Sequence, residues 1–486
     1  MTDLTVQDYR ALIREALIST VDSDTDAPNI QRLYTPDTHR RALQPDVTIV
    51  RGARGVGKTV WYKSLQEDSL RQVAADSYQI PTLSSIRPVQ GYGSARSPEN
   101  YPNAATLRML LAQRVEPLDI WMAVLLKALG NTEIAAKQTW KERVQWAADS
   151  PEEVDVFLTE ADRRAGQQGE RVLVLFDALD RLHDNRRDAD VLARGILRLA
   201  LDLRLGAQNI RAKVFIRPDM LDSALLDFTD SSKLVANAAE LTWSNTNLFG
   251  LFFHYLGNGP VNWASTFRAA TGTHWRVVES GLRYITPERV AADRTTQQDI
   301  FIEIAGPYMG TNHRKGHTYS WLPNHLMDGA EQVSPRSFLS ALSKAAELTA
   351  DTYSGHDRPL HYEAIRSGVQ HASRIRVQEI REDIPWVASV VESLEGLQVP
   401  IERGVIEDRW DEYNVFESLR SDYGSETVGD DEAKTGPQSF TSDGLISELV
   451  ELGVMSYRRD GRIDLPDVYR IAFNIGRKGG VPRVAR

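Results

Sequence analysis

The run GARGVGKT constrains the fold of this 486-residue chain more than any other feature. Four of its residues fit G-x-x-x-x-G-K-[ST], the pattern of a phosphate-binding loop: Gly52, Gly57, Lys58 and Thr59. A short β-rich run, PDVTIV, precedes the loop, and a helical pattern follows it from Lys58 to about Gln72. Such a loop requires this context, because loop N–H groups and the helix N-terminus then converge on phosphate. The sequence therefore predicts a nucleotide-binding α/β domain.

Composition narrows the class of protein. The chain is 42% hydrophobic and 26% charged, as globular proteins are, and its length suggests about three domains. A net charge of -10 argues against a surface built throughout to coat nucleic acid, although a local basic patch stays open. The absence of cysteine excludes disulfides and thiolate zinc sites and fits a reducing cytoplasm. The sequence has no signal peptide and no apolar run near the ~18 residues of a membrane span, so we expect a cytoplasmic protein without a membrane partner.

Strands alternate with helices from Val47 to Trp243, which indicates a parallel sheet. The apolar run 172–176 has no polar alternation, as expected of a strand that is covered on both faces, and it ends at Asp177. AKVFIRPD and AAELTW predict two further strands, and Ser244 is placed to cap the next helix.

After this core the pattern changes to helices and then to a small basic end. The run VMSYRRDGRIDL, with Asp-Gly at its turn, predicts a hairpin of the winged-helix type. The expected fold class is thus α/β: a P-loop NTPase parallel sheet core, an enlarged helical lid and a C-terminal winged-helix domain. The expected divisions are an N-terminal helix and linker (1–44), the P-loop core (45–243), the helical lid region (244–398), and an acidic linker with the winged-helix domain (399–486).

The loop itself supplies the candidate nucleotide contacts. These are Gly52, Arg54, Gly55, Val56, Gly57, Lys58, Thr59 and Val60. Lys58 is expected to meet the β- and γ-phosphates, and Thr59 to hold Mg²⁺.

Acidic residues at the end of the buried strand extend the site. P-loop enzymes place the carboxylate that holds Mg²⁺ at this position, so Asp177 is expected to bind the metal with Thr59; the alternative is an aspartate that caps a helix. Many P-loop ATPases carry an acid at the next position to orient the attacking water, but here that residue is Ala178. Either Asp180 polarises the water, or hydrolysis is slow, or a partner completes the site.

Two arginines are further candidates. Arg217 follows a predicted core strand and faces the nucleotide crevice, where it either senses the γ-phosphate or pairs with Asp219 or Asp222. Arg336 stands in the first turn of a predicted helix, where the helix dipole disfavours a cation. It is expected either to reach a phosphate or to be a solvated surface arginine.

Several nucleotide-binding classes lack their signatures here. The chain has no Asn-Lys-x-Asp run of a GTPase and no Leu-Ser-Gly-Gly run of an ABC ATPase. It also lacks His-Glu-x-x-His, and its ten histidines form no metal-like spacing. A small-molecule kinase stays open but would not explain the helical and winged-helix parts.

Taken together, these motifs resemble the AAA+/STAND division of P-loop ATPases, in particular prokaryotic KAP-like ATPases and origin-recognition-type initiator ATPases. The resemblance rests on the Walker A loop, the strand with DALDR, the arginine after the next strand, SPRSF in a helical region and the terminal winged helix. DALDR is similar to the DDLDR of KAP-type proteins, with Ala178 in place of the second aspartate. The resemblance implies that Lys58 and Thr59 bind ATP and Mg²⁺, that Asp177 holds Mg²⁺, and that Arg217 and Arg336 are the two sensor arginines.

These features predict an ATP-binding and ATP-hydrolysing molecular switch whose lid and C-terminal domain move with nucleotide state. The resemblance implies a multi-component bacterial system, of which phage defence is one example, with a protein partner or a second copy of the chain. One alternative is a DNA-binding initiator or loader, in which the basic runs RRDGR and GRKGGVPRVAR contact phosphates. Another is a scaffold that binds ATP without turning it over. We favour a protein-facing surface for the basic end, because the chain as a whole is acidic.

Overall fold

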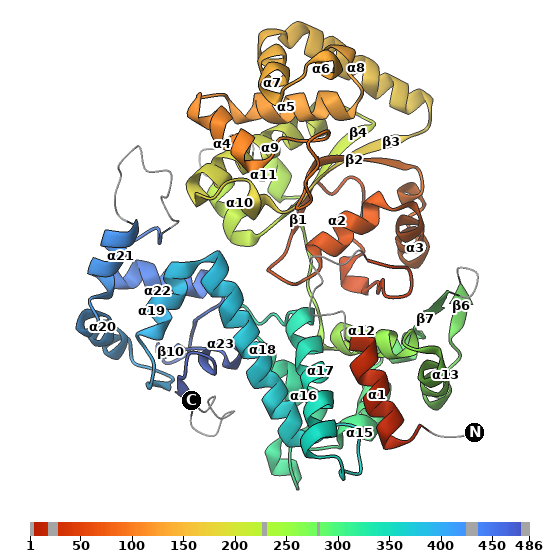
Figure 1. Ribbon diagram of the computed structural model, residues 1–486, viewed down its shortest axis with the longest axis vertical. Coiled ribbons are helices and arrows are strands. Elements are labelled where there is room, and N and C mark those ends of the chain that lie inside the picture. Colours follow the sequence, from red (N-terminus) through yellow and green to blue (C-terminus); the bar gives the residue numbers. More distant parts are fainter. Residues whose placement is uncertain (1–3, 18–27, 226–230, 279–281, 424–435, 478–486) are drawn as a thin grey trace.

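The computed structural model describes residues 4–17, 28–225, 231–278, 282–423 and 436–477. Figure 1 shows an α/β core, a helical region beneath it in the view, and a C-terminal domain beside both. Long helix α18 runs from the helical region to the C-terminal domain. This arrangement confirms the predicted fold class. No helix within the described ranges has the length and apolar character to cross a bilayer.

The core holds a five-stranded parallel sheet with the order β2-β3-β4-β1-β5. Its strands are β1 Ile49–Arg51, β2 Ile86–Tyr92, β3 Arg171–Phe176, β4 Ile210–Ile216 and β5 Ala239–Glu240. Because all strands run the same way, the residues that follow β1, β3 and β4 meet at one edge. This edge therefore gathers the phosphate-binding loop, Asp177 and Arg217.

Helices cover both faces of the sheet, as the unbroken apolar run of β3 predicts. Val172 and Val174 pack into one apolar cluster, and Leu173 and Leu175 pack into the other. The core helices are α2 Lys58–Gln66, α3 Asp68–Tyr78, α4 Ala104–Ala112, α5 Pro117–Ala128, α6 Thr132–Ala136, α7 Trp140–Asp149, α8 Pro151–Gln167, α9 Arg186–Gly206, α10 Pro218–Leu225 and α11 Ser231–Val235.

The helix expected to continue from Lys58 to about Gln72 is instead two helices. Glu67 between them is extended, with φ -92° and ψ 121°. The break leaves carbonyls of α2 without helical partners, and the buried Arg71 donates from Nη1 to the Leu65 carbonyl at 2.9 Å. A side chain of the second helix thus completes the end of the first.

The helical region includes the N-terminal helix, which packs on α12, α13 and α17. Its helices are α1 Val6–Leu17, α12 Asn245–Gly257, α13 Val261–Ala270, α14 Glu288–Ala292, α15 Arg294–Ala305, α16 Thr318–Leu326, α17 Pro335–Thr352 and α18 Tyr362–Asp383. Ser244 caps α12, because its hydroxyl accepts from the Asn247 amide as predicted. The sequence did not predict the hairpin of β6 Arg276–Val278 and β7 Arg283–Ile285.

The C-terminal domain combines helices with a hairpin wing. Its elements are α19 Pro385–Glu392, β8 Gln398–Val399, α20 Arg403–Glu412, α21 Val415–Tyr423, α22 Ser442–Glu451, β9 Ser456–Tyr457, β10 Ile463–Asp464, α23 Asp467–Arg470 and β11 Gly476–Arg477. Gly461 in the hairpin turn has φ +85°, as the Asp-Gly signal predicts. The stretch expected to be an acidic linker is largely helical, because Ile406, Trp410 and Leu419 pack into the apolar core of this domain.

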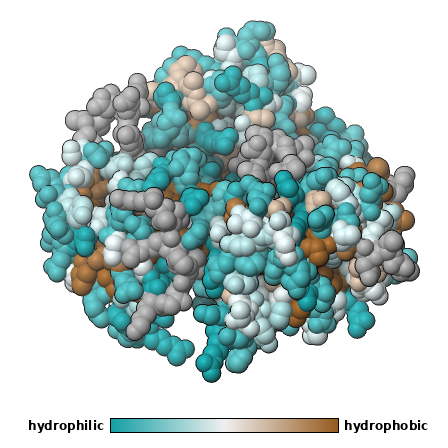
Figure 2. All heavy atoms as spheres, turned by 60° about the horizontal axis from the view of Figure 1, so that its bottom comes forward, coloured by the Kyte–Doolittle hydropathy of each residue, from teal (hydrophilic) through white to brown (hydrophobic). Residues whose placement is uncertain are grey.

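Short 3-10 helices form turns of the described chain at Asp37–His39, Pro81–Leu83, Leu179–Arg181 and His313–Lys315. Part of the expected acidic excursion, 424–435, and the basic end, 478–486, lie outside the described residues. The face shown in Figure 2 is mainly hydrophilic, with apolar residues in separate patches. Scattered patches of this kind are normal for a protein surface.

Candidate nucleotide-binding site

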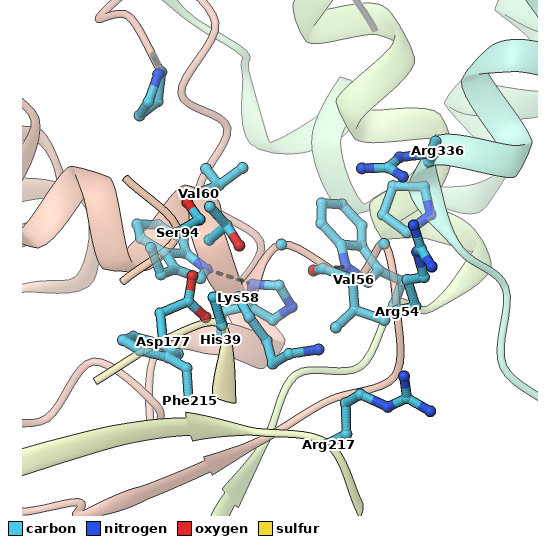
Figure 3. Close-up of a pocket in the computed structure, with 18 of the residues that line it drawn as sticks. His39, Arg54, Val56, Lys58, Val60, Ser94, Asp177, Phe215, Arg217 and Arg336 are labelled. Carbon is cyan, nitrogen blue, oxygen red and sulfur yellow. Dashed lines mark hydrogen bonds between the residues drawn. The ribbon is translucent and has the colours of Figure 1, made fainter. Parts of the chain in front are cut away.

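A cavity of about 660 Å³ lies between the carboxyl edge of the sheet and the helical region. The phosphate-binding loop, Asp177, Asp180 and Arg217 line it from the core, and Arg336 lines it from α17. Figure 3 shows Lys58 between Asp177 on one side and Arg54, Arg217 and Arg336 on the other. The structure therefore brings the predicted catalytic residues to one cavity.

The loop is folded as its glycines suggest. Gly55 and Gly57 have φ +79° and +106°, a range that residues with a side chain rarely adopt. Lys58 begins α2, and its Nζ donates to the carbonyls of Gly52 at 2.7 Å and Ala53 at 2.9 Å. Burial lowers the pKa of Lys58 to about 8, partly offset by the charge of Asp177.

Asp177 and Thr59 fit a Mg²⁺ site. Asp177 is only 1% exposed; the Thr59 side chain hydrogen-bonds to it, and its Oδ2 has no hydrogen-bond partner among the described residues. Burial raises the pKa of Asp177, while the Thr59 hydrogen bond and the Lys58 charge act in the opposite direction. A buried carboxylate oxygen that lacks a partner, beside a hydroxyl, is a hard-oxygen donor set that suits Mg²⁺. The described ranges contain no group of three or more His, Cys, Asp or Glu side chains that could hold a metal ion.

Asp180 lies at the exposed margin of the cavity. Ala178 has φ 56° and ψ 41°, a left-handed conformation that turns the chain from β3 into the 3-10 helix Leu179–Arg181. This turn directs Asp180 to solvent, near enough for its charge to act on Asp177 and Lys58. The arrangement provides a solvent-accessible carboxylate beside the phosphate-binding loop. Arg181, which the sequence reasoning had not singled out as a site residue, lines the cavity as well.

The two candidate sensor arginines both make ion pairs. Arg217 donates from Nε to Asp219 Oδ1 at 3.0 Å, the pairing expected as one alternative, and its Nη1 lies 3.5 Å from Asp383 Oδ2. Arg336 has a side chain only 15% exposed and donates from Nη1 to Glu379 Oε1 at 2.9 Å. Arg336 is therefore no solvated surface residue, and both guanidiniums lie against the cavity.

Aromatic side chains line another part of the cavity wall. Tyr34 and Trp243 stack with ring centroids 6.2 Å apart and planes 26° apart, and Tyr255 also lines the wall. The indole of Trp243 donates to the Val56 carbonyl at 2.9 Å, which ties this wall to the phosphate-binding loop. Flat apolar rings beside a phosphate loop can accommodate a planar base.

Behind this wall His39 is fully buried, and its Nδ1 accepts from Trp61 Nε1 at 2.9 Å. Burial lowers the pKa of His39 to about 3, so the ring is neutral near pH 7. The sequence reasoning missed Tyr34, His39, Trp243 and Tyr255, because they come from segments about 200 residues apart and no local pattern joins them.

Comparisons with known proteins give weak structural likenesses alone. No protein-family model matches the sequence, and no curated protein shows significant similarity to it. The chain is similar to the Aeropyrum pernix ORC2 protein, solved as ADPNP-ADP complexes, at 12% identity and a TM-score of 0.38, with 87% of this chain and 84% of that chain covered.

Two other solved structures show a likeness of the same order. The Aeropyrum pernix ORC1 protein in complex with DNA has 15% identity and a TM-score of 0.32, with 93% of both chains covered. Cdc6p from Pyrobaculum aerophilum has 12% identity and a TM-score of 0.30, with 87% and 83% covered. With values this low, the functional assignment rests on the geometry of the site.

Proposed function

We propose that this protein binds ATP with Mg²⁺ between its core and its helical region and hydrolyses it as a molecular switch. The observation that carries the proposal is the convergence of Lys58, Thr59 and Asp177 with arginines from two sides of one cavity. The helical region contributes Arg336 to that cavity, so a nucleotide there contacts both bodies. No described contact bears on the wider setting of such a switch, phage defence included.

Each residue has a role that follows from its place. Loop N–H groups and Lys58 bind the β- and γ-phosphates, while Thr59 and Asp177 hold Mg²⁺. The bound Mg²⁺ would neutralise charge that develops on the phosphate oxygens. Arg217 and Arg336 donate to the γ-phosphate. Asp180 accepts a hydrogen bond from the water that attacks the γ-phosphorus. The bond between the γ-phosphorus and the oxygen that bridges it to the β-phosphate breaks, and ADP is the leaving group.

The test of binding is Lys58→Ala. Removing one charge-assisted contact costs about 1.5–3 kcal/mol, so affinity for ATP should fall by roughly 10- to 150-fold. Lys63→Ala, on the same helix but outside this cavity, is the matched control and should bind ATP normally. Calorimetric titration measures both. Unchanged affinity in a folded Lys58→Ala variant would remove the basis of the proposal.

Turnover separates the switch from the scaffold alternative. A switch releases phosphate at a measurable steady rate in Mg²⁺, and Asp177→Asn abolishes that release. A scaffold also loses ATP affinity in the Lys58→Ala variant, but it releases no phosphate.

The DNA-binding alternative has less support from the wing. Arg458 pairs with Asp464 and Arg462 pairs with Asp460, so much of the basic charge of the hairpin is neutralised internally. Such a surface is better suited to a protein than to a phosphate backbone. The test is DNA binding by the full chain: salt-sensitive affinity that is lost on truncation at Gly453 would favour the initiator reading.

A further inference from the structure

Helix α18 carries two carboxylates toward the nucleotide cavity. Glu379 and Asp383 are four residues apart near its end, so they lie on one face of the helix. Their side chains are 12% and 22% exposed. Neither residue stands out in the sequence, because RVQEIREDIP reads as an ordinary charged helix end.

The two carboxylates contact three arginines that line the nucleotide cavity. Glu379 Oε1 accepts from Arg336 at 2.9 Å and lies 3.8 Å from Arg54 Nε. Asp383 pairs with Arg54 Nη1, and its Oδ2 lies 3.5 Å from Arg217 Nη1. The arginines come from the phosphate-binding loop, from the end of β4 and from the start of α17. The two acids thus join three separate elements around the place proposed for the γ-phosphate.

A carboxylate and a phosphate compete for the same face of a guanidinium. Both present anionic oxygens that can accept from the N–H groups of arginine, singly or in pairs. The N–H groups that the three arginines now direct at Glu379 and Asp383 cannot bond to a γ-phosphate at the same time. ADP has no γ-phosphate and does not enter this competition.

The same helix also holds the C-terminal domain. One turn before Glu379, Arg376 donates from Nε to the Tyr469 hydroxyl at 3.1 Å and from Nη1 to Glu379 Oε2 at 3.2 Å. Only Ile384 separates the end of α18 from α19 of the C-terminal domain. Displacing the end of α18 therefore shifts the start of that domain.

From these contacts we propose that Glu379 and Asp383 occupy the arginine cluster as substitutes for the γ-phosphate, and that ATP but not ADP displaces them and releases the C-terminal domain. This inference rests on the proposed function and adds to it the element that reads the nucleotide. In the opposite arrangement the acids hold the arginines in place for phosphate. Removing the acids would then weaken the binding of ATP instead of strengthening it.

The first experiment measures affinity in the double variant Glu379→Gln/Asp383→Asn. If the acids compete with phosphate, the variant binds a non-hydrolysable ATP analogue at least about tenfold more tightly than the wild type, since each ~1.4 kcal/mol of relieved competition is a factor of ten. Its affinity for ADP stays within about twofold. Glu382→Gln is the matched control, because Glu382 is exposed on the same helix and bonds to Gln378 instead.

Equal or weaker binding of the analogue in the double variant overturns the inference and leaves the proposed function standing. A parallel rise in affinity for ADP also overturns it, because the acids would then not read the γ-phosphate. A wild-type protein that binds neither nucleotide overturns both proposals.

The second experiment follows the C-terminal domain. The chain has no cysteine, so Val156→Cys on α8 and Tyr457→Cys on the wing can be labelled alone for energy transfer. Both side chains are exposed, at 70% and 56%. The analogue is expected to change the transfer efficiency and ADP is not, while Glu379→Gln/Asp383→Asn shows the change without nucleotide. The same efficiency in the wild type and the variant under all conditions overturns the release of the domain.

Discussion

Replacing Asp177 with asparagine is expected to stabilise the ligand-free protein while it removes the response to Mg²⁺ and ATP. Asp177 is buried, one of its oxygens has no hydrogen-bond partner in the described part of the chain, and its pKa is raised by burial. A raised folded-state pKa means that the ionised form costs stability at neutral pH. The asparagine variant has nearly the same shape and no charge.

The size of the gain follows from two opposing effects. A buried polar group without a partner costs about 1–3 kcal/mol, and the cost is larger for a charged carboxylate than for the neutral amide that replaces it. Loss of the carboxylate also removes an attraction to Lys58, and this attraction raises the pKa of Lys58 against the effect of burial. We therefore expect a net gain of about 1 kcal/mol, or a rise in Tm of about 2–4 °C for a core of this size.

Bound Mg²⁺-ATP is expected to make the wild type more stable than the Asp177→Asn variant. At a nucleotide concentration of about 100 times Kd, bound Mg²⁺-ATP stabilises the wild type by about 2.7 kcal/mol, and Asp177→Asn forfeits most of that gain. Thermal melts with and without Mg²⁺ and a non-hydrolysable ATP analogue measure both effects. Asp180→Asn serves as the control for stability. Because Asp180 is exposed, this variant should melt at the same temperature as the wild type when no ligand is present. A ligand-free Asp177→Asn protein that melts below the wild type would refute the reasoning.

Three further expectations concern turnover, the loop and acid stability. Asp180→Asn should slow steady-state ATP hydrolysis by about 10²-fold or more with little change in ATP affinity, as expected for a water-orienting group; a normal rate would make Asp180 structural. Gly55→Ala should weaken ATP binding, because Gly55 has φ +79° and an added Cβ would lie 2.5 Å from Ser334 Oγ; affinity equal to the wild type would contradict this. Burial lowers the pKa of His254 from 6.5 to about 3, so the unfolded chain gains a proton first and stability is lost as pH falls through this window. His254→Gln should therefore show a shallower fall of Tm between pH 6.5 and 4, and an unchanged slope would assign the acid sensitivity to other groups.

The parts of the site that lie within one motif could be predicted from the sequence, and the parts that join distant segments could not. Gly57, Lys58 and Thr59 form a contiguous pattern, and Asp177 ends a strand whose apolar run is unmistakable. Trp243 stacks on Tyr34 across 209 residues, and Glu379 pairs with Arg54 across more than 300, so neither contact leaves a local signal.

Elements of the fold with a clear local pattern could also be predicted from the sequence, and elements without one could not. The core strands β1, β3, β4 and β5 and the Asp-Gly wing were predicted from period and turn chemistry, whereas the hairpin of β6 and β7 was missed. Its strands have three residues each, and Val277 on one of them is exposed, so no alternation is long enough to detect. The acidic stretch was read as a linker because its charges outnumber its apolar residues. Trp410 and Leu419 nevertheless fill the core of the C-terminal domain, and spacing alone did not reveal that.

If the protein binds ATP as proposed, the origin of the three arginines couples nucleotide affinity to domain arrangement. Arg54 belongs to the phosphate-binding loop, Arg217 to the sheet edge and Arg336 to the helical region, so a ligand that engages all three holds two bodies together. Glu379 and Asp383 hold the same three from a helix that leads into the third body. Any difference in free energy between the phosphate-bound and carboxylate-bound arrangements is shared by the binding step and the domain step. A substitution that weakens the hold of the carboxylates on the arginines must therefore raise the affinity for ATP and favour release of the C-terminal domain together. This holds even where the substituted residue contacts neither the nucleotide nor that domain.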